Sequence, residues 1–275
     1  MSEMKIQKIT RKIGLIGVGN MGAAILEGLL SKGLAEPSRV WVFDKITEKA
    51  RDFSKQWNVR AADSNAELAR STEALILAVK PQDFPNTALE IKDVLASGQG
   101  VISILAGTPI EKIAEALGPK PAVVRAMPNL GAKVGQSVTA LAGKNPEMLE
   151  LAKDIFSGCG EALILDEKHF DLVTALSGSG PAYFFLLMEM MAAEGVSGGL
   201  SPEEARLLAV QTALGAGLLA QASSETPEAL RKRVTSKGGT TEAALGVMEA
   251  AKIRGIFHEA IQAARNRGRE LASGR

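Results

Sequence analysis

The 275-residue sequence has few of the side chains that carry nucleophilic and metal chemistry. Cys159 is the only cysteine, and His169 and His258 are the only histidines. A single cysteine cannot form an intramolecular disulfide, so nothing indicates an oxidising compartment. These three residues supply neither the ligand set of a zinc site nor a Cys-His or Ser-His-Asp nucleophile system. We therefore predict no bound metal and no hydrolytic activity.

An excess of charge of one sign is also lacking. The formal net charge is +1, and 23% of the residues are charged. The sequence therefore shows no electrostatic footprint for nucleic acid or for anionic membranes. The first twelve residues lack the apolar core of a signal peptide. The longest uncharged run, 207–224, is barely long enough to span a membrane and contains several polar residues. We expect a cytoplasmic protein that binds neither nucleic acid nor membrane.

The first 165 residues alternate short apolar runs with amphipathic segments. Strands are predicted at 12–17, 39–44, 74–79, 100–105, 122–127, 137–142 and 161–166, and helices among the early ones at 21–32, 47–57 and 82–96. Continuous apolar runs separated by helices are typical of a parallel, doubly wound sheet. The fold class is therefore α/β, with a Rossmann-like dinucleotide-binding domain over residues 1–165.

Residues 166–275 contain no further convincing strand. Helices are predicted at about 167–176, 181–195, 202–222, 227–233, 241–251 and 253–272. The helix at 207–222 is apolar all round and contains small residues that allow close approach of a partner. Such a helix is buried in a core or between subunits. We predict an all-helical domain for substrate binding and dimerisation.

The segment "GLIGVGNMG" follows a predicted strand and opens a helix. Gly17, Gly19 and Gly22 match the pattern G-x-G-x-x-G, in which the glycines allow a tight turn, close approach of a pyrophosphate and helix–strand packing. The phosphates then lie at the positive end of the helix dipole. This segment predicts a dinucleotide site that includes Val18, Asn20 and Met21.

Asp44 ends the second predicted strand, 22 residues after Gly22. An acid at this place accepts hydrogen bonds from the adenine ribose and repels a 2′-phosphate, which favours NAD. Lys45, Thr47 and Lys49 follow at once and could hold a phosphate if Asp44 turned away. An Asp that only caps the next helix is the plainer alternative. The choice between NADP and NAD stays open on these residues.

A Lys-Pro pair directly follows another predicted strand, in "AVKPQ". The carboxyl ends of parallel strands face the ligand crevice, so Lys80 and Pro81 are expected near the cofactor together with Ala78 and Val79. A plain turn explains the same residues equally well.

Four hydroxyl residues and a glycine pair stand at a predicted helix start in "VTSKGGTTEAAL" (234–245). One hydroxyl suffices for ordinary capping. Consecutive N–H groups from Gly238 to Thr241, with the hydroxyls of Ser236, Thr240 and Thr241, suit a carboxylate or a phosphate. Because the dinucleotide phosphates already have a site, we expect a substrate anion here. A well-capped helix is the alternative.

Five segments together resemble the pyrroline-5-carboxylate reductase family: "IGVGNMG", "LAVKPQ", "VVRAMPN", "DLVTALSGSGPAYFFLLME" and "VTSKGGTT". They span nearly the whole chain in the family's order. The resemblance implies reduction of 1-pyrroline-5-carboxylate, a cyclic imine carboxylate, to L-proline by NADPH or NADH. It also implies an active site between the Rossmann domain and helices of a paired subunit, in a homodimer or a larger ring of dimers.

The resemblance also implies roles for particular residues. Ser236, Gly239 and Thr240 would hold the substrate carboxylate, and the hydroxyl of Thr241 would lie at the ring nitrogen as the catalytic group. Asn65, Ala106 and the Ala78–Pro81 loop would join Gly17–Gly22 around the cofactor. The chain departs from the family at Lys237, where proline is common, and at Leu130 and Gly131, where Thr-Pro is common.

Two other classes of protein fit part of the sequence. A β-hydroxyacid dehydrogenase needs a basic lysine for alcohol oxidation, and the helix "AYFFLLMEMMAAEG" contains none. A non-catalytic NAD(P)-binding sensor has no use for a second anion site. Reduction of the imine, the last step of proline biosynthesis, is therefore the predicted function.

Overall fold

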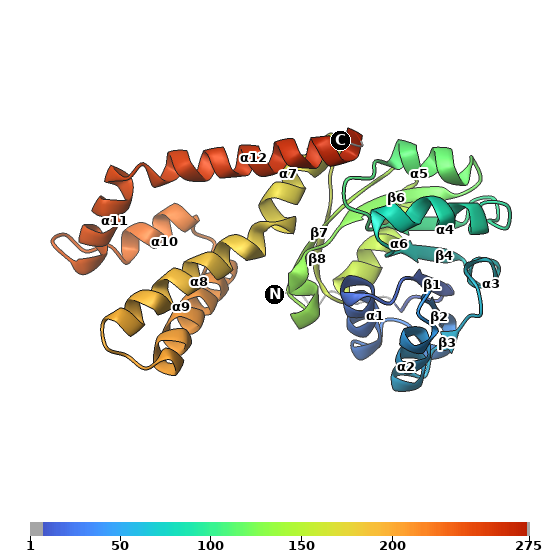
Figure 1. Cartoon of the computed structure of the whole chain (residues 1–275), viewed down its shortest axis with the longest axis horizontal. Helices are drawn as coiled ribbons and strands as arrows, with labels where there is room; N and C mark the ends of the chain where they lie inside the picture. Colours follow the sequence, from blue (N-terminus) through green and yellow to red (C-terminus); the bar gives the residue numbers. More distant parts are fainter. Residues whose placement is uncertain (1–7, 274–275) are drawn as a thin grey trace. The chain divides into compact units, whose positions relative to one another are not determined.

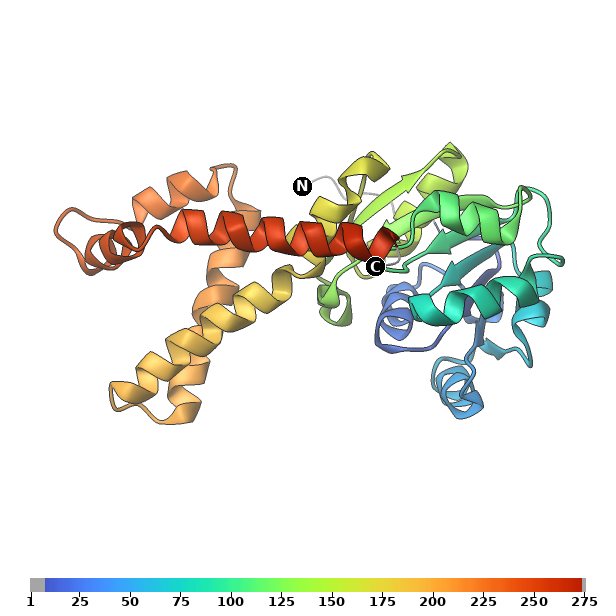
Figure 2. The ribbon, with the colours of Figure 1, turned by 45° about the horizontal axis from the view of Figure 1, so that its top comes forward.

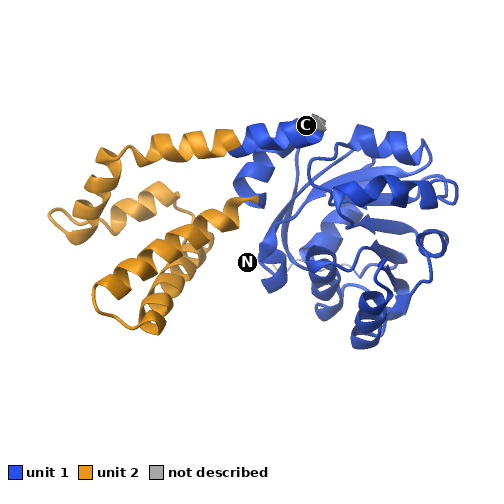
Figure 3. Ribbon diagram, in the orientation of Figure 1, with its two compact units in different colours: residues 1–178, 264–275 blue, residues 179–263 orange. Residues whose placement is uncertain are grey.

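The computed structural model describes residues 8–273. The chain divides into two compact units, Met1–Gly178 with Ala264–Arg275, and Ser179–Ala263 (Figure 3). The first unit contains the sheet and the second is helical, so the α/β fold with a helical C-terminal part is confirmed.

One eight-stranded sheet forms the centre of the first unit. Its order is β3-β2-β1-β4-β5-β6-β7-β8. The strands are β1 (Ile13–Ile16), β2 (Val40–Phe43), β3 (Arg60–Ala61), β4 (Ala74–Leu77), β5 (Gly100–Ser103), β6 (Ala122–Met127), β7 (Ser137–Gly143) and β8 (Gly160–Ile164). The seven predicted strands are present. Strand β3 was not predicted, because its two residues are exposed and form no apolar run.

All neighbouring strands run parallel except β6 and β7. Only residues 128–136 connect β6 to β7, and they contain no more than the 3₁₀ turn Leu130–Val134. A parallel crossover needs a dozen or more residues, so this short connection forces the chain to return antiparallel. Helix α6 (Pro146–Ser157) then supplies the longer crossover to β8.

Helices cover both faces of the sheet (Figure 1). Helices α1 (Asn20–Ser31), α2 (Thr47–Trp57) and α6 pack into one apolar cluster. Helices α3 (Asn65–Ser71), α4 (Phe84–Ile91) and α5 (Ile110–Leu117) pack into the other. Strands β1 and β4 are buried along their whole length, which explains their uninterrupted apolar sequences. Each buried leucine or isoleucine there contributes about 2 kcal/mol to folding.

The first compact unit continues past the end of the sheet. After β8 come the short helix α7 (Phe170–Val173) and a π-helical turn, Thr174–Gly178. Phe170 is fully buried beside Ala140 and Ala142 of β7, which holds this segment to the sheet. The predicted domain boundary between residues 165 and 166 lies just after the last strand. The first compact unit extends further, to Gly178, because Phe170 packs against β7.

The second unit consists of helices α8 (Gly180–Ser197), α9 (Pro202–Ala222), α10 (Pro227–Arg233), α11 (Thr240–Ala250) and the first part of α12 (Ile253–Ser273). Helices α8 and α9 lie side by side in both views (Figures 1 and 2). Gly195 allows this approach, because a Cβ there would lie 2.9 Å from Cβ of Ala205. Ser201 and Glu204 form a capping box at the start of α9.

Many large apolar side chains of the helical unit are exposed in the single chain. On α8 and α9 they are Phe184, Phe185, Leu186, Leu187, Met190, Met191, Val196, Leu207, Leu208, Leu214, Leu218 and Leu219. The helical segment Glu167–Ser197 is long and apolar enough to span a membrane by length and composition. Helices α9 and α10 meet the same criterion only when they are taken together, and they are bent by 120° at the break between them. An apolar surface of this extent marks a contact with another molecule.

Candidate active site

The carboxyl ends of three neighbouring strands, β2, β1 and β4, meet at one edge of the sheet. The N–H of Gly17 donates to Phe43 O at 2.8 Å, and the N–H of Ala78 donates to Ile16 O at 2.9 Å. These bonds join the loops after β1, β2 and β4, and strand order reverses between β1 and β4, where doubly wound folds bind ligands. A cavity of about 500 Å³ opens there. It is lined by Ile16, Gly17, Gly19, Phe43, Asp44, Lys45, Ile46, Lys49, Asn65, Ala78, Val79, Lys80, Asp83, Asn86, Thr87 and Glu90.

A different structural feature explains the glycine at each of the three positions of the Gly-rich loop. Gly17 has φ +101°, and a Cβ there would lie 2.7 Å from Ala78 O. A Cβ on Gly22 would lie 2.3 Å from Gly17 O. Nothing lies within 4 Å of a Cβ built on Gly19, the N-cap of α1, so this position leaves free space at the helix start. The first turn of α1 holds no acid. This loop fits a pyrophosphate.

Asp44 is tied to the Gly-rich loop by its side chain. Its Oδ2 accepts the N–H of Val18 at 2.8 Å, and its Oδ1 accepts the N–H of Ile46 at 2.9 Å. Helix α2 has Ile46 as its N-cap and no side-chain capping bond, so the plain capping alternative for Asp44 does not describe the structure. At the rim of the cavity Lys45 pairs with Asp83, with Nζ 2.9 Å from Oδ2.

Asn65 is the first residue of α3, and 7% of it is exposed. Its Nδ2 donates to Oε2 of Glu90 on α4 at 2.7 Å. Because a carboxylate only accepts, this bond fixes the amide with nitrogen toward Glu90. The buried Oδ1 of Asn65 has no hydrogen-bond partner among residues 8–273. Glu90 was not predicted as a site residue, because its partner lies 25 residues away on another helix.

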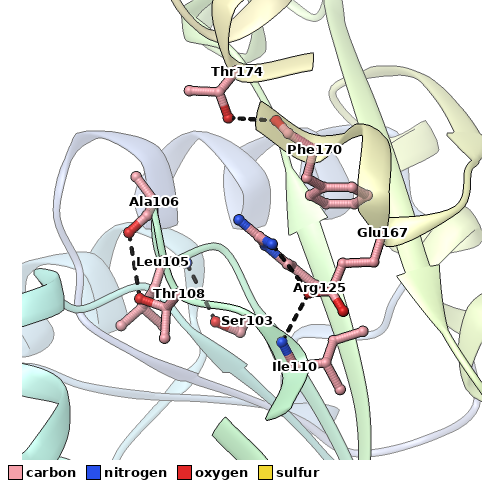
Figure 4. A network of polar contacts seen from close by, with 9 residues as sticks. All are labelled: Ser103, Leu105, Ala106, Thr108, Ile110, Arg125, Glu167, Phe170 and Thr174. Atoms are coloured by element: carbon pink, nitrogen blue, oxygen red, sulfur yellow. Dashed lines mark hydrogen bonds and ion pairs between the residues drawn. The ribbon is translucent and has the colours of Figure 1, made fainter. Parts of the chain in front are cut away.

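Some of the other predicted cofactor residues line this cavity, and others do not. Ala78, Val79 and Lys80 line it, whereas Val18, Asn20, Met21, Gly22, Pro81 and Ala106 are not among its lining residues. The side chain of Asn20 accepts a hydrogen bond from Lys133 at 3.2 Å. Ala106 lies in the loop after β5, where its carbonyl accepts from the hydroxyl of Thr108 at 3.3 Å (Figure 4).

A network of charged side chains that was not predicted lies at the start of α5, which follows the loop after β5. Arg125 is 5% exposed, and its Nη1 lies 3.0 Å from Oε1 of Glu167. The same carboxylate oxygen accepts the N–H of Ile110 at 2.8 Å, at the start of α5. The guanidinium of Arg125 also stacks on Phe170, 4.8 Å from the ring centroid (Figure 4). The network thus joins β6, α5 and the segment after β8.

The second predicted site lies in the helical unit, at the turn before α11. The N–H of Gly239 donates to Ser236 O at 3.0 Å, and Gly238 has φ +72°. The N–H of Gly238 donates to Oε2 of Glu242 at 2.7 Å. Two of the four N–H groups expected to face an anion are therefore used by the turn itself. The N–H groups of Thr240 and Thr241 begin the helix and have no partner within it.

Hydroxyl groups surround these two N–H groups. No hydrogen bond within the described part of the chain involves the hydroxyl of Ser236, Thr240 or Thr241. The first turn of α11 carries Glu242 as its only acid, and that carboxylate is held by Gly238. The helix start therefore offers donors for one small anion.

Neither the cavity lining nor the turn before α11 contains a histidine or a cysteine. Across residues 8–273, no group of three or more His, Cys, Asp or Glu side chains could hold a metal ion. Cys159 is fully buried against the sheet, and this desolvation raises the pKa of its thiol to about 11. The arrangement supplies binding and orientation of ligands more than acid–base chemistry.

The fold and the dinucleotide cavity define a Rossmann-type, NAD(P)-dependent oxidoreductase with a separate helical unit. Residues 12–107 match the family model "NADP oxidoreductase coenzyme F420-dependent", and residues 167–271 match "Pyrroline-5-carboxylate reductase dimerisation". A pyrroline-5-carboxylate reductase of Methanosarcina acetivorans is 39% identical over 264 residues, which cover 95% of this chain and 98% of the relative. The chain belongs to the pyrroline-5-carboxylate reductase family, as its motifs predicted.

Solved structures agree with this membership. A pyrroline-5-carboxylate reductase from Coxiella burnetii has a TM-score of 0.91 at 36% identity, with 96% of this chain and 99% of that chain covered. A pyrroline carboxylate reductase from Plasmodium falciparum, described with NADP bound, has a TM-score of 0.83 at 28% identity, with 96% and 99% covered. The β-hydroxyacid dehydrogenase and sensor alternatives are not favoured by these relatives.

Proposed function

We propose that this chain reduces 1-pyrroline-5-carboxylate to L-proline, the last step of proline biosynthesis, with NADPH or NADH as the reductant. The bound nicotinamide supplies a hydride when it is present. The observation that carries the proposal is the presence of two separate helix starts without a side-chain cap, at α1 and at α11. The first suits the pyrophosphate and the second suits the substrate carboxylate.

Ser236, Gly239 and Thr240 hold the substrate carboxylate in this proposal. The hydroxyls of Ser236 and Thr240 and the N–H groups at the start of α11 supply hydrogen bonds to its oxygens. The positive end of the α11 dipole favours the same negative charge. Lys237 is exposed in this turn and adds a positive charge near the anion.

Thr241 is the catalytic group, and it acts by orientation. The protonated imine already carries positive charge on nitrogen. Hydride adds to C5, a new C–H bond forms, and the C=N electron pair moves to nitrogen. No strong acid has to donate a proton in that step. The hydroxyl of Thr241 accepts a hydrogen bond from the ring N–H and holds C5 at the distance required for hydride transfer.

Residues Gly17 to Gly22, Asp44, Asn65, Ala78 to Pro81 and Ala106 hold the cofactor in this proposal. The free space at Gly19 and the orphan oxygen of Asn65 support the assignment. Asp44, Asn65 and Ala78 line one cavity, which is large enough for part of a dinucleotide.

The active protein is a homodimer or a larger ring of dimers, in the cytoplasm, without nucleic acid or membrane as a partner. The match to a dimerisation family over residues 167–271 supports the oligomer. The exposed apolar faces of α8 and α9 are the surface that a second copy covers. The small net charge of +1 supports the absence of a nucleic-acid partner.

Isotope transfer tests the proposed reaction. The protein is supplied with 1-pyrroline-5-carboxylate and with a cofactor carrying deuterium in place of both hydrogens at the nicotinamide C4 position. We expect L-proline with one deuterium at C5, detected by mass spectrometry. Proline without deuterium, or no proline, would contradict the proposal.

A further inference from the structure

We infer that the cavity selects NADH over NADPH, and that Asp44 is the specificity-determining residue. This inference deepens the proposed function and rests on it for the identity of the cofactor class. Asp44 is held by two hydrogen bonds, and the charged side chains that line the cavity have a formal charge of zero.

Asp44 cannot turn away from the cavity at low cost. Its two carboxylate oxygens each accept one backbone N–H, from Val18 and from Ile46. Rotation of the side chain would break both bonds and leave the N–H of Val18 without its partner in a part-buried position. The negative charge therefore stays at the end of β2, beside the Gly-rich loop. Each oxygen still has acceptor capacity for a ligand hydroxyl.

Asn65 and Glu90 add acceptor atoms to the cavity that Asp44 lines. The orphan Oδ1 of Asn65 is held in place by the bond from Nδ2 to Glu90. The carboxylate of Glu90 has only acceptor atoms as well. An adenosine ribose with free 2′- and 3′-hydroxyls brings donors to such atoms. A 2′-phosphate replaces one of these donors with further acceptors.

The charge at the rim does not favour a phosphate. Three acids line the cavity, Asp44, Asp83 and Glu90, and three lysines line it, Lys45, Lys49 and Lys80, so the lining has a formal charge of zero. Lys45 is already paired with Asp83. A phosphate monoester adds about −1.5 to −2 charges at neutral pH. Lys49 and Lys80 form no ion pair with the described residues, but their two charges are matched by the carboxylates of Asp44 and Glu90 in the same lining, so no net positive charge remains for a phosphate.

Direct binding tests the inference without any imine present. NADH and NADPH are titrated into the wild-type protein, and the increase in nicotinamide fluorescence gives each Kd. We expect a Kd for NADH that is about tenfold or more below that for NADPH. The ratio of the two Kd values should decrease at high salt, because salt screens the repulsion between Asp44 and the 2′-phosphate. An equal or lower Kd for NADPH would overturn the inference. Because no turnover is required, failure of the proposed reaction would leave this result unaffected.

Two variants assign the preference to one residue. Asp44→Asn removes the charge but retains an oxygen that accepts a backbone N–H, so we expect the Kd ratio to fall about tenfold, chiefly through tighter NADPH binding. Glu48→Gln removes an exposed acid in the first turn of α2 that does not line the cavity, and it should leave the ratio unchanged. An unchanged ratio in Asp44→Asn, or an equal change in Glu48→Gln, would remove Asp44 from the assignment.

Discussion

Oε1 of Glu167 lies 3.0 Å from Nη1 of Arg125 and accepts the N–H of Ile110 at 2.8 Å. One carboxylate oxygen thus holds both a nearly buried guanidinium and the start of a helix. Cζ of Arg125 also lies over the ring of Phe170, 4.8 Å from its centroid. The arrangement fixes the segment that leaves the sheet after β8 against β6.

This arrangement predicts a large effect on stability. Arg125→Ala leaves Glu167 without its cation and removes the stacking on Phe170, so we expect the free energy of unfolding to fall by about 3 kcal/mol. Arg125→Lys keeps the charge but not the planar stacking group, and it should recover part of the loss. Chemical denaturation measures both.

An exposed ion pair serves as the control for these variants. Lys8 and Glu36 lie 3.0 Å apart, with side chains 70% and 57% exposed. Lys8→Gln should change the free energy of unfolding by no more than about 0.5 kcal/mol. If Arg125→Ala behaved like this control, the network around Glu167 would have no structural role.

The turn before α11 predicts a specific steric effect. A Cβ on Gly239 would lie 2.4 Å from Oγ of Ser236, so Gly239→Ala displaces that hydroxyl. If Ser236 binds the substrate carboxylate, we expect KM for the imine to rise about tenfold or more, with an unchanged Kd for the cofactor.

A double substitution separates this effect from general damage. Ser236→Ala should raise KM by itself, and the double variant Ser236→Ala with Gly239→Ala should be no worse than the more affected single variant, because the clash is then removed. Fully additive effects would show that Gly239 does not act through Ser236.

The buried thiol predicts a pH dependence of stability. Burial raises the pKa of Cys159 to about 11, whereas an unfolded thiol has a pKa near 8.5. Above the unfolded pKa the unfolded chain loses this proton first, so the unfolded state is favoured and stability falls between about pH 8.5 and 11. Cys159→Ala should flatten this part of the curve of melting temperature against pH. Identical curves for the two proteins would contradict the assignment.

The exposed apolar face predicts an effect on assembly. Phe184 on α8 is 61% exposed in the single chain, and Leu89 on α4 of the other unit is also 61% exposed. Phe184→Glu should reduce the particle toward the 28.9 kDa chain mass in light scattering, whereas Leu89→Glu should not. A wild-type protein that is already monomeric at micromolar concentration would contradict the oligomer.

Much of the fold could be predicted because its signals are local. Buried strands such as β1 and β4 are uninterrupted apolar runs, and helix starts carry Pro or Ser at fixed places. Strand β3 has two exposed residues and carries no such signal. The direction of β7 depends on the length of a connection, which an apolar pattern does not report.

The site shows the same division between local and distant information. The Gly-rich loop and Asp44 are separated by a predictable strand and helix, and they lie together in one cavity. The pairs Asn65–Glu90 and Arg125–Glu167 join residues that are 25 and 42 positions apart. No periodicity connects such partners, because only the packing of the helices and strands brings them together.

Reduction of the imine is the central claim, and the most direct measurement follows nicotinamide absorbance. Wild-type protein and Thr241→Val are each supplied with 1-pyrroline-5-carboxylate and either NADH or NADPH. We expect the wild type to consume cofactor and form an equal amount of proline, with a markedly lower kcat in Thr241→Val and an unchanged Kd for the cofactor. Folded wild-type protein that binds the cofactor but consumes none with this imine would contradict the assignment.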